Sequence, residues 1–320
     1  MQPYQPTVGE RVLLVLFTVL LLSMVVVGAV LARRNLRLGR GDRHGASRLA
    51  AFGFVAWAAA GFFGAHHVPN YDKLELFFEC LAWALLLSCF FWVLYIALEP
   101  YVRRRWPATL VSWSRLLAGG FRDPLVGRDV LAGCLWGASV TALLQLRWFV
   151  RSWLGDLPGP MTTGPLWSLL GARTVIAGMS NGLNSALVFS FSFLFVLFLF
   201  RVLLRKEWAA AVAFVLFFTI FLNAPLLFAS GRSVASALVV GLILNGLSVF
   251  LLIRLGMLAL VASGVFQFCF LSLPLTTQGS AWYAGISLAG ILLMAAMAFY
   301  GFYTSLSGRP VFGGAVLVEE

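Results

Sequence analysis

Residues 99–129, EPYVRRRWPATLVSWSRLLAGGFRDPLVGRD, form the longest polar interruption in an otherwise apolar chain. Six of these thirty-one residues are arginines. The sequence on both sides consists of long apolar runs, which are typical of membrane helices. The segment is therefore expected to lie in water or at the lipid headgroups, between two sets of membrane helices.

The composition indicates an integral membrane protein. Hydrophobic residues make up 61% of the 320 positions and charged residues 11%, and the mean hydropathy is +0.93. Soluble domains are nearer half apolar and a quarter charged. Because a span needs about 20 residues, the chain has room for roughly eight to ten spans. We expect an all-α polytopic protein, with residues 1–320 forming a single membrane domain.

Nine apolar segments are predicted to cross the bilayer. The boundary that is hardest to place lies in 234–273, where Arg254 is the only charge and a turn at Arg254-Leu255-Gly256 would have to join two spans, so two spans or one remain possible there. The first segment is expected to be retained as an anchor, because it has neither the basic start nor the cleavage site of a signal peptide. The predicted spans are 12–32, 49–65, 76–98, 130–146, 175–200, 209–228, 234–253, 257–273 and 284–303.

The distribution of basic residues predicts the orientation. With nine alternating spans, the links on one side, 99–129 among them, carry 17 of the 23 lysines and arginines, and the other side carries 6. The positive-inside rule places the first side in the cytoplasm. We therefore expect an outside N-terminus and a cytoplasmic C-terminus. The net charge of +11 is explained by this arrangement, and no nucleic acid is expected as a partner.

Part of the 99–129 link has the pattern of an interfacial helix. Over 103–118, Trp106, Trp113 and neighbouring leucines recur at helical spacing opposite the arginines. Pro107 suits the start of such a helix, and Gly119-Gly120 would end it. Anionic lipid headgroups or a cytoplasmic partner are the expected contacts of eight arginines: Arg33, Arg34, Arg103, Arg104, Arg105, Arg115, Arg122 and Arg128.

Six uncharged polar residues fall inside the predicted spans. Such residues either hydrogen-bond between helices or line a path for a solute. All twelve acidic residues lie in links or at span ends, so coupled proton transport is not expected. The six are Gln145, Asn181, Asn184, Asn223, Asn245 and Gln267.

No catalytic residue or cofactor is predicted. His66 and His67 with Glu79 are weak candidates for a metal site, since adjacent residues of a helix point about 100° apart. Glu99-x-x-x-Arg103 and His66-x-x-x-Asn70 loosely match pieces of intramembrane CAAX-type proteases, but their order along the chain is reversed. Phosphate-binding glycine loops and hydrolase or kinase motifs are absent from the sequence.

Three stretches together resemble a known family. They are LARRNLRLGRGDRHGASRLA (31–50), LEPYVRRRWPATLVSWSRLLAGGFRDPLVGRDVL (98–131) and the pair PLTTQGSAWYAG (274–285) and FYGFYTSLSGRPVFG (299–313). The chain resembles the multispan C-terminal region of certain bacterial membrane-anchored serine/threonine protein kinases. The resemblance implies the bacterial cytoplasmic membrane, signal transduction and association with a kinase domain, which this sequence lacks. Both a freestanding relative and a fragment fit this pattern.

Three functional hypotheses follow. The first is a non-catalytic membrane module that senses or transmits a signal, or docks a cytoplasmic partner through links 33–48 and 99–129. The second is a permease for a small neutral or lipid-like solute, which requires a polar cavity around Asn184, Asn223 and Asn245. The third is an intramembrane enzyme, which requires His66 or His67 to meet Glu79 or Glu99.

Overall fold

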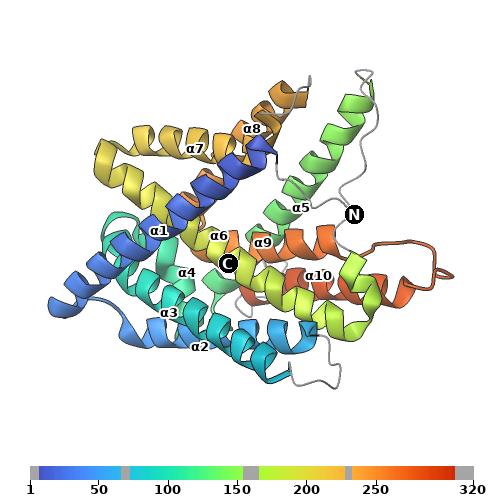
Figure 1. Ribbon diagram of the computed structural model, residues 1–320, viewed down its shortest axis with the longest axis horizontal. Helices are drawn as coiled ribbons and strands as arrows, with labels where there is room; N and C mark the ends of the chain where they lie inside the picture. Colours follow the sequence, from blue (N-terminus) through green and yellow to red (C-terminus); the bar gives the residue numbers. More distant parts are fainter. Residues whose placement is uncertain (1–6, 66–72, 154–165, 228–232, 307–320) are drawn as a thin grey trace, which may run out of the picture.

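The protein is helical throughout the part that the structure describes. The structure is a computed structural model, and it describes residues 7–65, 73–153, 166–227 and 233–306 (Figure 1). Within these ranges there are ten α-helices, one short 3-10 helix and no strand. The helices are α1 Val8–Arg37, α2 Arg43–Gly64, α3 Lys73–Arg105, α4 Pro107–Leu117, α5 Pro124–Trp153, η1 Leu166–Leu170, α6 Ala172–Leu204, α7 Glu207–Leu227, α8 Ser233–Arg254, α9 Met257–Ser272 and α10 Ala284–Ser305.

Seven of the described helices are long and apolar enough to cross a membrane, which is the architecture of a multi-pass membrane protein. They are α1, α2, α3, α5, α6, α8 and α10. The apolar helices over Glu207–Asn223 and Met257–Ser272 are shorter. Each of the nine predicted spans therefore coincides with a helix. The crossing of the bilayer by α7 and α9 stays a prediction, as does the orientation of the termini.

The chain between 234 and 273 forms two helices. Helix α8 ends at Arg254 and α9 begins at Met257. Gly256 has a φ of 95°, a left-handed backbone that side chains disfavour. A Cβ at Gly256 would also lie 2.7 Å from the backbone oxygen of Thr109. The break therefore depends on glycine for its backbone and for its close contact with α4.

Helix α6 is the centre of the fold. Every side chain from Phe191 to Phe198 is buried, because α2, α3, α7 and α9 all pack against this helix. The ring of Phe193 lies 4.9 Å from that of Phe214 and 4.3 Å from that of Phe218 on α7. On the other side of α6, Phe191 meets Phe91 of α3 at 5.8 Å. Aromatic packing therefore joins the N-terminal helices to α7 through α6.

Small residues allow α5 to approach two neighbours closely. A Cβ at Gly127 would lie 2.5 Å from the backbone nitrogen of Ser305 on α10. A Cβ at Gly133 would lie 2.5 Å from the backbone oxygen of Ala259 on α9. Close approach at small residues is the usual way in which membrane helices pack. These contacts fix α9 and α10 against α5.

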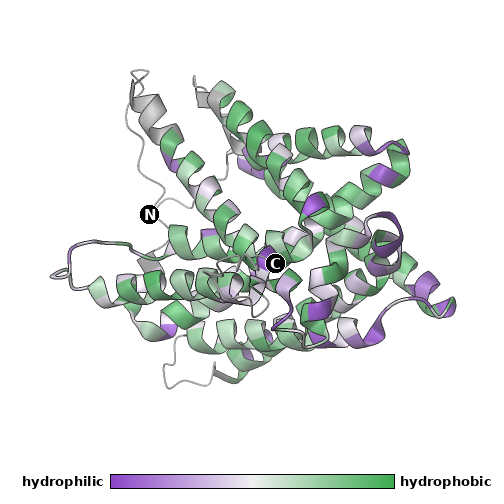
Figure 2. Ribbon diagram, turned by 180° about the vertical axis from the view of Figure 1, so that it is seen from behind, coloured by the Kyte–Doolittle hydropathy of each residue, from purple (hydrophilic) through white to green (hydrophobic). Residues whose placement is uncertain are grey.

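Most of the strongly hydrophilic ribbon gathers at one end of the helix bundle, on the right in Figure 2. We call this the arginine-rich end; it comprises the ends of α1, α3 and α6, the starts of α2 and α5, and α4. Asn35 of α1 is buried there, and its side chain donates to the backbone oxygens of Ile96 and Ala97 at 2.9 and 3.1 Å. The Arg48 side chain donates to the backbone oxygen of Leu117 at 2.7 Å.

The predicted amphipathic helix over 103–118 is present as α4, with Pro107 at its start and a φ of 93° at Gly119 after its end. Arg103, Arg104 and Arg105 belong instead to the last turn of α3, which continues through Pro100. Leu110 and Trp113 are buried, and the Trp113 ring lies 6.4 Å from that of Phe191. The apolar face of α4 therefore packs on the helix bundle, whereas an interfacial helix would turn this face toward lipid.

Candidate intramembrane binding site

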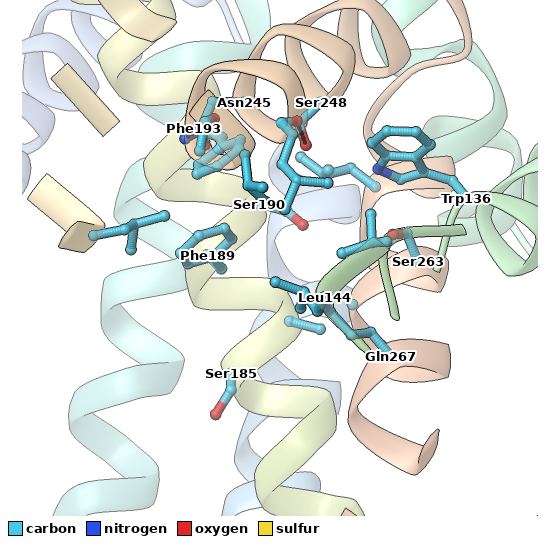
Figure 3. A pocket seen from close by; sticks show the side chains of 18 of the residues that line it. Trp136, Leu144, Ser185, Phe189, Ser190, Phe193, Asn245, Ser248, Ser263 and Gln267 are labelled. Carbon is cyan, nitrogen blue, oxygen red and sulfur yellow. Dashed lines mark hydrogen bonds between the residues drawn. The ribbon is translucent and has the colours of Figure 1, made fainter. Parts of the chain in front are cut away.

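A cavity of about 410 Å³ lies between α5, α6, α7, α8 and α9 (Figure 3). Its size is in the usual range for small-molecule sites. Helix α6 supplies Ser185, Phe189, Ser190 and Phe193, and α8 supplies Asn245 and Ser248. Trp136 comes from α5, and Ser263 and Gln267 come from α9. The cavity is therefore assembled from helices that are far apart in the sequence.

Three of the six predicted intramembrane polar residues line this cavity: Asn223, Asn245 and Gln267. Two of them are oriented by Thr219 of α7. The Asn223 amide donates to the backbone oxygen of Thr219 at 2.8 Å. The Asn245 amide donates to the hydroxyl of Thr219 at 3.2 Å and to the backbone oxygen of Gly241 at 2.8 Å. These bonds hold the amides in fixed positions and join α7 to α8.

Serine hydroxyls and aromatic rings complete the wall. Ser248 donates to the backbone oxygen of Leu244 at 2.7 Å. Ser190 and Ser263 are buried, and Trp136, Phe189 and Phe193 supply apolar surface. Among the described residues that line the cavity, none is ionisable. Since burying a charge without a partner is costly, this wall suits an uncharged solute that has both polar and apolar parts.

The cavity adjoins the outer surface of the helix bundle. Of its lining residues, Phe189 is 41% exposed and Leu222 is 44% exposed, and Ser185 is exposed as well. These residues lie on α6 and α7, whose apolar surfaces would face lipid in a membrane. A solute dissolved in the bilayer could therefore reach the cavity from the side.

The other three polar residues lie elsewhere. Gln145 is half-buried on α5, and Asn181 is exposed on α6. Asn184 is fully buried, but it does not line the cavity as the permease hypothesis expected. Its amide donates to the backbone oxygen of Ser180 at 2.9 Å. Asn184 and Phe191 are seven residues apart, which places them on the same face of α6. Phe191 contacts Phe91 of α3, so this face of α6 points away from the cavity.

The eight arginines predicted to contact headgroups or a partner are all exposed, and they lie around the arginine-rich end. Three of them form ion pairs: Arg103 with Glu99 at 3.0 Å, Arg115 with Asp123 at 2.7 Å and Arg128 with Asp129 at 2.8 Å. Glu99 and Asp129 are almost fully buried. The carboxylate of Asp123 pairs with Arg115 of α4, across the turn that follows this helix. This pair ties the link between α4 and α5 into a fixed shape.

The candidate metal site lies mainly outside the described residues. His66 and His67 lie outside the described residues, and Glu79 is exposed on α3. In the described part of the chain, no three His, Cys, Asp or Glu side chains form a group that could hold a metal. Glu79 and Glu99 are twenty residues apart on α3, or roughly 30 Å along the helix axis. The intramembrane-enzyme hypothesis needs one of these two carboxylates beside a histidine, and it stays a prediction because both histidines lie outside the described residues.

Sequence reasoning missed the serines of the cavity, because Ser185, Ser190, Ser248 and Ser263 resemble ordinary small residues of packed helices. It also assigned no role to Arg201 and Arg205, which follow the predicted span 175–200. Their spacing of four residues was a usable signal, since it places both on one face of a helix.

No protein-family model, no curated protein and no solved structure matches the chain. The resemblance to the membrane regions of bacterial serine/threonine kinases therefore stays a prediction.

Proposed function

We propose that the protein binds a small, uncharged, lipid-like solute in the cavity between α5 and α9 and acts as a permease for it. The observation that carries this proposal is that Asn223, Asn245 and Gln267, which belong to three different helices, line one cavity. None of the described residues that line this cavity is ionisable. Hydrogen bonding between helices accounts for the contact of Asn245 with Thr219, and the placement of all three residues around one cavity of about 410 Å³ is what favours a ligand.

The chemical composition of the cavity wall favours a solute with a polar head and an apolar body. Amide and hydroxyl groups offer hydrogen bonds, whereas Trp136, Phe189 and Phe193 offer apolar contact. The exposed residues Ser185 and Leu222 give access from the lipid side. An alkyl alcohol or a monoacylglycerol has this chemistry, and a fatty-acid anion does not.

The test uses monooctanoylglycerol as the probe and octanoate as its charged counterpart. We expect the purified protein in nanodiscs to bind radiolabelled monooctanoylglycerol and to exclude octanoate. Proteoliposomes should take up monooctanoylglycerol faster than protein-free liposomes. Ser248→Leu places a larger apolar side chain in the cavity and should abolish binding and uptake.

The matched control is Ser139→Leu on α5. Both hydroxyls donate to the backbone oxygen four residues earlier, at 2.7 Å for Ser248 and 2.8 Å for Ser139, and both side chains are half-buried. Only Ser248 lines the cavity. Equal uptake by wild type and Ser248→Leu would contradict the proposal.

The ordered arginine-rich end favours a second candidate, a membrane module that transmits a signal or docks a cytoplasmic partner. Helix α4 is held by the bundle, and the link after it is fixed by the Arg115–Asp123 pair and by the Tyr300 hydroxyl, which donates to the backbone oxygen of Phe121 at 2.6 Å. Exposed arginines such as Arg104 and Arg122 then project from a rigid base. Binding of monooctanoylglycerol without uptake would favour this candidate over the permease.

A further inference from the structure

A second pocket lies at the arginine-rich end, between the last turns of α3 and α6. It has a volume of about 380 Å³ and shares no lining residue with the cavity between α5 and α9. Half of its lining is basic and the other half is apolar. The lining residues are Arg105, Trp106, Phe198, Arg201, Val202 and Arg205.

The charge of this pocket is only partly balanced by the protein, because one of its three arginines, Arg201, has an ion-pair partner among the described residues. None of the described lining residues is acidic. The nearest described carboxylate to Arg201 is that of Glu207, which is 3.7 Å away and belongs to a residue whose side chain is 65% exposed. Guanidinium groups that share a pocket repel one another. An anion between them would offset this repulsion, and the guanidinium fork matches the geometry of phosphate oxygens.

The protein holds Arg201 in position. Its side chain is only 16% exposed, and its Nη1 donates to the backbone oxygen of Arg205, which caps the end of α6. Its Nε is buried and makes no hydrogen bond with the described residues. The Arg201 guanidinium is thus held at the pocket by the protein, with one buried donor unmatched.

The backbone of Arg205 is a second, independent sign. Arg205 follows α6 with a φ of 59°, the one positive φ of a non-glycine residue in the described part of the chain. Glycine is the usual residue after a helix in this conformation, because a Cβ is disfavoured there. The chain keeps an arginine at a position where glycine would be more stable. A role for the Arg205 side chain in the pocket accounts for this choice.

We propose that this pocket binds a phosphate group, carried by an anionic lipid headgroup or by a free phosphate compound. Three guanidinium groups supply donors and charge. Phe198 and the 56%-exposed Val202 supply apolar surface beside them, which an acyl chain could cover. Trp106 is a residue type that is enriched at the membrane interface, where headgroup phosphates lie.

The test measures phosphatidylglycerol binding to the purified full chain by native mass spectrometry. Arg205→Gly removes one guanidinium and relieves the backbone, so affinity should fall about tenfold while the melting temperature stays level or rises. Arg105→Gln should weaken binding to a similar extent. Lys206→Gln is the matched control, because it removes the same charge from the same link but does not line the pocket.

A second arm distinguishes the two sources of the phosphate group. Pyrophosphate is added to the purified protein in lipid-free detergent micelles, and the melting temperature of the protein is measured. A saturable rise in wild type that Arg205→Gly loses assigns the pocket to a free phosphate compound. Selective loss of phosphatidylglycerol binding without a pyrophosphate response assigns it to a lipid. Equal phosphatidylglycerol binding by wild type, Arg205→Gly and Lys206→Gln, with no pyrophosphate response, overturns the proposal.

Discussion

Asn35 of α1 donates a hydrogen bond of 2.9 Å to the backbone oxygen of Ile96 in α3. Within a regular helix this oxygen would accept from the backbone nitrogen four residues later. That residue is Pro100, which has no N–H. Asn35 therefore supplies the donor that the proline removes, and it joins α1 to α3 at the point where the helical ladder of α3 is interrupted.

This relationship predicts a coupling between Asn35 and Pro100. Asn35→Ala should lower the free energy of unfolding by about 1–3 kcal/mol, because it leaves a buried oxygen without a donor. When Pro100→Ala restores the backbone N–H, the same change at Asn35 should cost less. SDS titration in mixed micelles of the two single variants and the double variant measures the coupling. Additive effects would show that the hydrogen bond to Ile96 does not depend on the proline.

Two glycines should respond to alanine with opposite signs. At Gly127 a Cβ would lie 2.5 Å from the backbone nitrogen of Ser305 and 2.8 Å from the backbone oxygen of Gly301. Gly127→Ala should therefore destabilise the protein by about 1–3 kcal/mol through overpacking of α5 against α10. At Gly246 nothing lies within 4 Å, so Gly246→Ala should stabilise α8 by about 0.5–1 kcal/mol.

The melting temperatures of the two glycine variants in detergent report these effects. Because both replacements are glycine to alanine within a helix, their intrinsic helix propensities cancel in the comparison. A loss of stability at Gly246 equal to that at Gly127 would mean that the close approach of α5 and α10 is not the cause.

The predicted orientation can be tested by labelling single cysteines with a membrane-impermeant maleimide. Ser47 near the start of α2 and Ser280 in the link before α10 are both exposed. The start of α2 and the link before α10 lie toward opposite ends of the bundle (Figure 1). The test uses a variant in which the four native cysteines are replaced by serine: Cys80, Cys89, Cys134 and Cys269. In this variant, Ser280→Cys should react with the maleimide in intact cells. Ser47→Cys should react only after the membrane is opened. The reverse pattern would place the arginine-rich end outside.

The sequence predicted the helices well, because apolar runs such as 12–32 and 284–303 are decided by local composition. It placed residues 103–105 in the helix predicted over 103–118, whereas they belong to α3. Helix α3 continues through Pro100, where Asn35, sixty-five residues earlier, supplies the missing donor. Periodicity revealed that α4 has an apolar face. It could not reveal that the bundle, rather than lipid, covers that face, because contact with other helices and contact with lipid both favour apolar residues.

The candidate sites were less predictable. Asn184, Asn223 and Asn245 each follow a leucine and precede a small residue, yet only the last two line the cavity. Which side of a helix faces a cavity depends on how the helices rotate and cross, and this is set by contacts such as those of Gly133 and Gly137 with α9. The arginines of the second pocket belong to helices that meet only in the folded chain.

Gln267 separates a binding role from a structural one. It lines the cavity, and its side chain makes no hydrogen bond with the described residues. Gln267→Leu should therefore leave the melting temperature unchanged or raise it, because an unmatched polar group is replaced by an apolar one. The same variant should weaken monooctanoylglycerol binding by about tenfold, since a hydrogen bond to the glycerol head is lost.

The matched variant is Gln145→Leu, which changes a half-buried glutamine of α5 that does not line the cavity. It should leave monooctanoylglycerol binding unchanged. If Gln267 instead joins helices, Gln267→Leu must lower the melting temperature and leave the relative affinities for monooctanoylglycerol and an alkane of equal length unaltered. Because the two roles predict opposite changes in stability and in selectivity, the pair of measurements decides between them even before the natural solute is known.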